Sequence, residues 1–212
     1  MIPSSDRELA SLDESRSSSA NVHVRTDSVS SSKIKAKLPC LEKIELSKAD
    51  LCGVDFSEVE LDEANLFEAI LIGADVSRAY LVNSNFRRAN LGGANLFGSN
   101  LDGADFTQAN LAKVDFSEAS VCGAKFVGAD LGARSDFSET DFSGANLKKA
   151  NMKMGEFTDT ILSKADLQGA DLRQAEDLTC AQIQSAIIDR NTKLPENIRL
   201  EWAPDETFRC FC

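Results

Sequence analysis

Few residues of this chain have the type and spacing that a catalytic or metal-binding site requires. His23 is the only histidine among 212 residues, and it lies in a Ser-rich segment that we predict to be disordered, so a Ser-His-Asp triad, a Cys-His pair and a His-rich metal site are not expected. No glycine-rich phosphate loop ending in Lys-Ser or Lys-Thr occurs. Carboxylates are abundant, but acid–base catalysis needs a desolvated cleft that shifts their pKa values. We therefore predict that the protein is not an enzyme and binds no cofactor or metal.

The cysteines show neither a C-x-x-C motif nor the dense pattern of a small secreted domain, so the sequence predicts free thiols. The terminal Cys210-Phe211-Cys212 allows three interpretations: a metal-binding or redox pair, a prenylated C-x-C terminus, or a tail with free thiols. The last is favoured because nothing around it supports the other two. The six cysteines are Cys40, Cys52, Cys122, Cys180, Cys210 and Cys212.

The elements that position these residues follow from one pattern, a large apolar residue at every fifth position. The pattern runs from Leu46 to Leu172 without exception, and one extra residue within 132–136 interrupts its spacing. A period of five matches neither the 3.6 residues of a helix nor the 2.0 of a strand, so it indicates a repeat architecture. Sorted by every fourth member, these centres define four sides. The first side has Leu46, Leu66, Phe86, Phe106, Phe126, Leu147 and Leu167; the second has Leu51, Leu71, Leu91, Leu111, Leu131, Met152 and Leu172; the third has Phe56, Val76, Leu96, Phe116, Phe137 and Phe157; the fourth has Leu61, Leu81, Leu101, Val121, Phe142 and Leu162.

The residues around each centre predict one short side and one corner. A small residue, mostly Ala, stands two positions before the centre and points to the same side of an extended segment. Asp or Asn usually precedes the centre, and nine of the 12 glycines lie two positions after it, where a type II turn needs a positive φ. Four such sides close a square coil of 20 residues, whose stacking buries every centre.

The repeats Ala94-Asn95-Leu96-Phe97-Gly98 and Ala104-Asp105-Phe106-Thr107-Gln108 resemble those of the pentapeptide-repeat family. The resemblance covers about 130 residues and implies an all-β solenoid, a right-handed quadrilateral β-helix of about 6.5 coils. Seven of the eight core Phe fall on the first and third sides, which face each other in a square coil, and this predicts aromatic columns along the axis.

Four segments follow from this organisation. We predict a disordered Ser-rich tail over 1–36, the β-helix over 37–177, a C-terminal cap over 178–202 and a tail over 203–212. The cap should contain a short helix over 181–188 with Thr179 as its N-cap, and it resembles the closing helix and turn that often follow pentapeptide repeats. Trp202 should pack on this cap or, alternatively, serve as an exposed partner contact. The extra residue is interpreted as a tolerated corner insertion. The alternative is that the insertion orients Arg134 for a function.

The charge of the chain is concentrated in the repeats, because residues 41–178 account for all of the net −11. Such a surface disfavours direct binding to nucleic acid or anionic membranes and favours basic partners. The third side is the most acidic, with nine acids against Arg78, although a solvated surface without function is the alternative interpretation. These nine acids, the acidic stripe, are Asp55, Glu58, Asp75, Asp115, Glu118, Asp136, Glu139, Glu156 and Asp159.

Apolar residues at outward positions are the second candidate binding feature. Phe67, Ile70 and Ile72 should share one corner, and Tyr80 and Phe97 lie in neighbouring coils. Exposed apolar clusters often mark contact sites, so these residues are candidates for partner binding or a homodimer, with cover by the N-terminal tail as the alternative.

The sequence therefore predicts a non-catalytic protein-interaction scaffold or adaptor with an unidentified protein partner. It has no long apolar span and no apolar signal core, so we expect a cytoplasmic location and no membrane contact. The family resemblance implies one alternative. Rows of carboxylates on a stiff rod would imitate duplex DNA and modulate DNA gyrase or topoisomerase, as quinolone-resistance pentapeptide proteins are understood to do.

Overall fold

The computed structural model describes residues 43–211. The expected tail over 1–36, the start of the expected β-helix at 37–42, His23, Cys40 and Cys212 lie outside the described residues. Within 43–211, no helix is long and apolar enough to cross a membrane.

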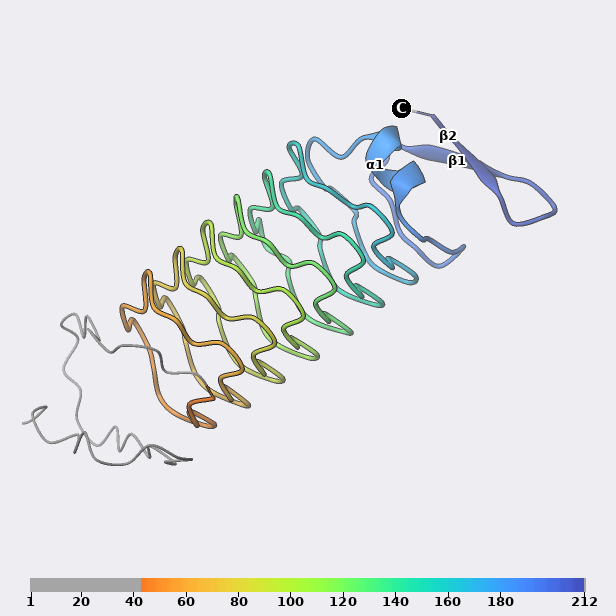
Figure 1. Cartoon of the computed structure of the whole chain (residues 1–212). Helices are drawn as coiled ribbons and strands as arrows, with labels where there is room; N and C mark the ends of the chain where they lie inside the picture. Colours follow the sequence, from red (N-terminus) through yellow and green to blue (C-terminus); the bar gives the residue numbers. More distant parts are fainter. Residues whose placement is uncertain (1–42, 212) are drawn as a thin grey trace, which may run out of the picture.

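The described chain forms a four-sided solenoid whose coils stack into a rod (Figure 1). Four parallel ladders run along the rod, and each joins residues 20 positions apart, as in Asp50 to Ile70 to Asn90. Most centres donate their backbone N–H to the next coil, for example Leu46 to Asn65 at 2.8 Å, and Asn65 donates back to Ile44 at 2.9 Å. The coil period of 20 residues predicted from the sequence is therefore correct.

The one-residue insertion is absorbed in a widened corner. Asp115 pairs with Asp136, a separation of 21 instead of 20, and the ladders on both sides continue. Ala133 and Arg134 both have positive φ and are exposed, whereas Ser135 is buried and donates its hydroxyl to the Leu111 carbonyl at 3.1 Å. This geometry agrees with a corner insertion, because the extra residue points away from the core.

The corners explain why Asp and Asn precede the centres. The side-chain oxygen at this position accepts the N–H two residues on, as in Asp105 to Thr107 and Asn95 to Phe97, each at 3.0 Å. That N–H would otherwise lack a partner at the turn. Nine glycines in the second position after a centre have φ between 61° and 71°, as predicted. Many corners hold another residue there, such as Glu118 at 58°.

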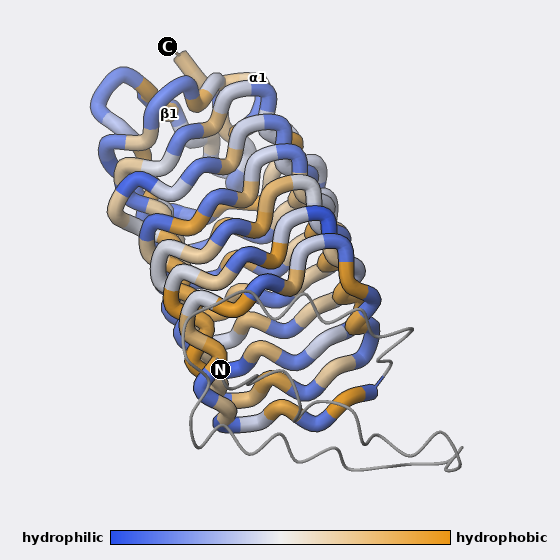
Figure 2. The backbone as a smooth tube through the Cα atoms, turned by 90° about the vertical axis from the view of Figure 1, so that its left-hand side faces the viewer, coloured by the Kyte–Doolittle hydropathy of each residue, from blue (hydrophilic) through white to orange (hydrophobic). Residues whose placement is uncertain are grey.

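The core is a continuous column of centres and small residues, and Figure 2 shows apolar and polar residues alternating along the coils. On the first side, Phe106 stacks between Phe86 and Phe126 at centroid distances of 4.7 and 4.9 Å. Phe116 of the third side meets Phe106 and Phe126 edge to face at 6.1 and 6.0 Å. The predicted aromatic columns are thus confirmed, and their two sides interlock across the core.

The C-terminal end of the rod is covered by α1 (Cys180–Ser185) and the loop after it. Thr179 caps the helix as predicted, but α1 begins one residue before and ends three residues before the predicted 181–188. The helix stops early because the chain resumes the ladders: Ile187 pairs with Asp166, and Lys193 with Asp171. Gln182 donates its amide to the Phe157 and Thr160 carbonyls at 2.8 and 2.9 Å, so these carbonyls keep hydrogen bonds at the end of the coils.

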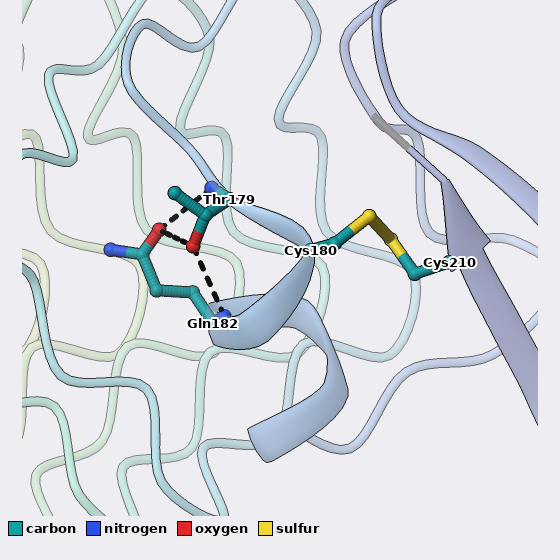
Figure 3. Close-up of a disulfide and its surroundings, with 4 residues drawn as sticks. All are labelled: Thr179, Cys180, Gln182 and Cys210. Atoms are coloured by element: carbon teal, nitrogen blue, oxygen red, sulfur yellow. Dashed lines mark hydrogen bonds between the residues drawn. A yellow bond between two sulfur atoms is a disulfide. The ribbon is translucent and has the colours of Figure 1, made fainter.

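Two predictions for the C-terminal residues are wrong. Residues 203–212 were expected to be a tail, but β1 (Arg199–Trp202) and β2 (Phe208–Phe211) form an antiparallel hairpin. Cys180 and Cys210 were expected to be free, but they form a disulfide between α1 and β2 (Figure 3). Sequence spacing did not reveal either feature, because the pairing depends on how the non-repeating end folds back. Cys52 and Cys122 are free, as predicted. Trp202 is half-buried and packs against Phe208 at 5.2 Å, which agrees with a structural place in the cap.

We expect Gly155→Ala to destabilise the fold by about 1–3 kcal/mol, because overfilling a packed core forces neighbouring groups to shift. A methyl group there would lie 2.6 Å from a ring carbon of Phe137 and 3.1 Å from one of Phe157, both fully buried. Gly92→Ala is the matched control, since its new methyl would have no neighbour closer than 3.5 Å. Urea unfolding followed by circular dichroism measures both, and equal midpoints for the two variants would contradict the prediction.

Candidate functional site

The third side of the rod, which carries the predicted acidic stripe, has two kinds of carboxylate. Those just before a centre are half-buried and support their own corners, as Asp115 and Asp136 do by accepting the N–H groups of Ser117 and Ser138, each at 2.9 Å. Those two positions after a centre, such as Glu118, are exposed at the positive-φ residue of the corner. The first kind therefore has a structural role in addition to its charge, and the second kind faces solvent.

The C-terminal half of this side is more acidic than the stripe predicted from the sequence. Glu156 pairs with Glu176 in the third-side ladder, and Thr158 donates its hydroxyl to Asp177 at 3.2 Å. Both acids were missed because the apolar spacing ends at Leu172, although Glu176 still keeps the five-residue spacing. We call the resulting set the acidic face. It consists of Asp115, Glu118, Asp136, Glu139, Glu156, Asp159, Glu176 and Asp177.

Ion pairing leaves the acidic face uncompensated. Over residues 43–211 the ion pairs use the acids Glu63, Glu68, Asp166 and Asp171, none of which belongs to the acidic face. Lys113 and Arg134 stand at the neighbouring corner but form none of these pairs. The field of the acidic face is therefore directed to solvent, where it attracts positive charge.

The apolar candidates do not form one patch. Ile70 and Ile72 lie together on the second side and are 38% and 46% exposed, and Phe67 lies across the adjacent corner and is half-buried. Tyr80 is exposed but belongs to the fourth-side ladder between Glu60 and Asn100, on the opposite side of the coil.

Phe97 lies on the third side, half-buried, and its ring is covered by the guanidinium of Arg78 at 5.5 Å from the centroid. Phe67 and Ile72 lie in two different turns, one at each end of the second side, so the three residues do not share one corner as predicted, and Tyr80 and Phe97 belong to other sides.

The two free thiols are poor nucleophiles. A hydrogen bond with the Asp50 carboxylate, together with partial burial, raises the pKa of the Cys52 thiol. Burial raises the pKa of the Cys122 thiol, which also lies close to Asp141. Because the thiolate is the reactive form, neither position resembles an activated cysteine.

A basic cluster surrounds one carboxylate at the C-terminal end of the second side. Asp171 accepts two hydrogen bonds from the guanidinium of Arg173, at 2.7 and 2.9 Å, and its Oδ2 lies 3.5 Å from Lys153 Nζ and 3.7 Å from Lys193 Nζ. The Arg173 hydrogen bonds, aided by the charge of Lys153, lower the pKa of Asp171 from 3.8 to about 2 despite its burial. A shallow cleft beside it is lined by Lys153, Arg173, Gln174, Leu194, Pro195 and Glu196.

This network generates a pH-dependent prediction. Because the folded pKa of Asp171 is below its ordinary 3.8, the ionised group stabilises the fold above that pH, and the contribution is lost as pH falls toward about 2. We expect Asp171→Asn to lower the free energy of unfolding by about 1 kcal/mol at pH 7, a modest value because Arg173 is half exposed to screening solvent.

The difference between Asp171→Asn and the wild type should shrink between pH 4 and pH 2. Thermal melts across this range measure it, with Asp130→Asn in the same ladder as the control. A difference that stays constant down to pH 2 would rule out ionisation of Asp171 as the cause.

The sequence and the structure were both compared with those of known proteins, and both comparisons found pentapeptide-repeat proteins. A sequence profile for pentapeptide repeats matches in eight copies that together span residues 44–189. QnrB1, described as a plasmid-mediated fluoroquinolone resistance protein, has a similar structure, with a TM-score of 0.56 at 21% identity over 70% of this chain and 79% of that one. A pentapeptide repeat protein from Nostoc PCC 7120 aligns with a TM-score of 0.41 at 30% identity, covering 54% of this chain and 77% of its own. No curated protein matches the chain.

Proposed function

The chain belongs to the pentapeptide-repeat family, whose members fold as right-handed quadrilateral β-helices, and from this premise we propose that it is a non-catalytic scaffold that binds other proteins. The flat sides of the rod serve as its docking surfaces. Because side chains at outward positions do not take part in core packing, they are free to specify a partner without altering the fold.

The observation that carries this proposal is the acidic face. It supplies eight carboxylates in successive coils. Adjacent coils are about 4.8 Å apart, so like charges in one ladder stand close together on a rigid surface. A complementary basic surface on a partner relieves this repulsion and gains rate by electrostatic steering. The proposed partner is therefore a protein with a basic docking surface.

The same row of charge supports a second candidate function, mimicry of duplex DNA toward a DNA-handling enzyme such as gyrase or topoisomerase. The specific observation is the unbroken third-side ladder Asp115–Asp136–Glu156–Glu176, which aligns acids along the axis. Mimicry requires that duplex DNA compete for the bound enzyme and that affinity fall steeply with salt. A gyrase supercoiling assay at micromolar protein tests this candidate, and the absence of any effect would eliminate it.

Matched substitutions test the role of the acidic face. Asp115→Asn with Asp136→Asn removes two charges but keeps the corner hydrogen bonds, because Asn95 makes the same bond at the same position. Asp105→Asn with Asp130→Asn removes two charges from equivalent corners on the first and second sides. We expect the first pair to weaken binding of the physiological partner about tenfold and the second pair to leave it unchanged.

Affinity capture from a native lysate identifies the partner, and titration of each captured protein measures its affinity for the wild type and the two double variants. A partner retained by the wild type and by the control pair, but lost from the acidic-face pair, meets the expectation. Equal retention by all three proteins would show that the acidic face is not the docking surface. Retention that survives high salt would assign docking to apolar contacts instead.

We also propose that Ile70 and Ile72 contribute to self-association on the second side, where their side chains are exposed in one coil. Changing both to Ser should leave the coils folded and convert any homodimer into monomer, because the association loses its apolar contact. Ile161→Ser on the fourth side, at 48% exposure, is the control. Light scattering measures the mass, and a dimer that persists in the double variant would contradict this assignment.

A further inference from the structure

The C-terminal hairpin is held on the rod by half-buried apolar residues and a disulfide. Its inner face, formed by Leu200, Trp202 and Phe208, packs against the core residues of the cap but remains half exposed. Its outer face carries Arg199, Glu201 and Arg209 and is exposed.

Polar contacts do not anchor this hairpin. Over residues 43–211, no hydrogen bond or ion pair joins 199–211 to the coils or to α1. The guanidinium of Arg190 lies over the Trp202 ring at 5.2 Å, and this is a contact with the preceding loop. A two-stranded hairpin is marginally stable by itself, so its docking depends on what else connects it to the rod.

The disulfide is that connection. Cys180 is the first residue of α1 and Cys210 lies in β2, with Cα atoms 5.5 Å apart across a separation of 30 residues (Figure 3). α1 itself is firmly placed, because Ile183 is fully buried and Gln182 bonds to two carbonyls of the coils. The bond therefore ties a weakly docked hairpin to a firmly docked helix.

We propose that Cys180–Cys210 is a reducible clamp, whose cleavage by a dithiol reductant releases the hairpin and uncovers the apolar C-terminal end of the rod. Both cysteines are partly exposed, so a reductant reaches them. One thiolate of the reductant attacks a cysteine sulfur and forms a mixed disulfide, and the other cysteine leaves as a thiolate. The second thiol of the reductant then resolves the mixed disulfide. Two protein thiols form, and the reductant becomes a disulfide after giving two electrons and two protons.

Release changes the cap but not the coils. The ladders continue through Lys193 without any contribution from the hairpin, so they remain paired when the hairpin leaves. The inner hairpin residues Leu200, Trp202 and Phe208 and the core residues against which they pack then become more exposed. A reducing compartment such as the predicted cytoplasmic location would favour the open form, and an oxidising compartment the closed form.

The sole tryptophan and two arginines of the hairpin make the clamp measurable in the full-length protein. Dithiothreitol should shift the Trp202 emission to longer wavelength and increase tryptic cleavage after Arg199 and Arg209 on the order of 100-fold, because the 30-residue loop is no longer closed. Cleavage after Lys113, within the coils, should stay slow and reports that the rod is intact.

Cys180→Ser should show the open state without reductant and no further response to dithiothreitol. Cys52→Ser, which removes a free thiol on the second side, should respond as the wild type does. Alkylation and mass spectrometry verify the redox state of every sample.

Two outcomes would overturn the proposal. The first is an unchanged emission and cleavage pattern in fully reduced protein, which would mean that packing alone holds the hairpin. The second is simultaneous cleavage after Lys113, which would mean that the disulfide stabilises the whole rod.

Discussion

The structure depends on one constraint: every coil must supply the hydrogen-bond partners of the next. The N–H of most centres finds its carbonyl one coil away, as Leu46 does at Asn65, and residues about 20 positions apart meet in all four ladders. The insertion near Ser135 shows how strictly this holds, since the extra residue is confined to a corner and the ladders resume beyond it. Core packing obeys the same period, because the Phe columns form only when centres stack directly above one another.

This constraint separates the residues that build the rod from those that are free to vary. Centres and the small residues before them are buried, whereas outward positions contact solvent. Asp and Asn before the centres belong to both groups, since Asp115 supports its corner and also contributes charge to the acidic face. A substitution to Asn separates the two roles, which makes this surface suitable for testing.

The ends of the rod are where the constraint fails, because the last coil has no successor. The C-terminal end solves the problem with side chains and a partial coil: Gln182 bonds the Phe157 and Thr160 carbonyls, and Ile187 and Lys193 extend two ladders. The hairpin lies beyond this solution and forms no hydrogen bond with it among residues 43–211. Its attachment through Cys180–Cys210 is therefore chemically different from every other contact in the rod, and it is the one that a reductant can remove.

The sequence alone determined the coil period, the buried centres, the aromatic columns and the Thr179 cap. Each of these is encoded within five residues or by repetition of those five, so local geometry repeated along the chain is enough to specify them. Only the tertiary structure showed that Glu176 and Asp177 extend the acidic face beyond the last apolar centre. It also decided the hairpin and the pairing of Cys180 with Cys210, against the prediction of free thiols. The physical reason is that the terminal segment does not repeat, and contacts between distant, non-repeating residues depend on how the chain folds back onto the rod.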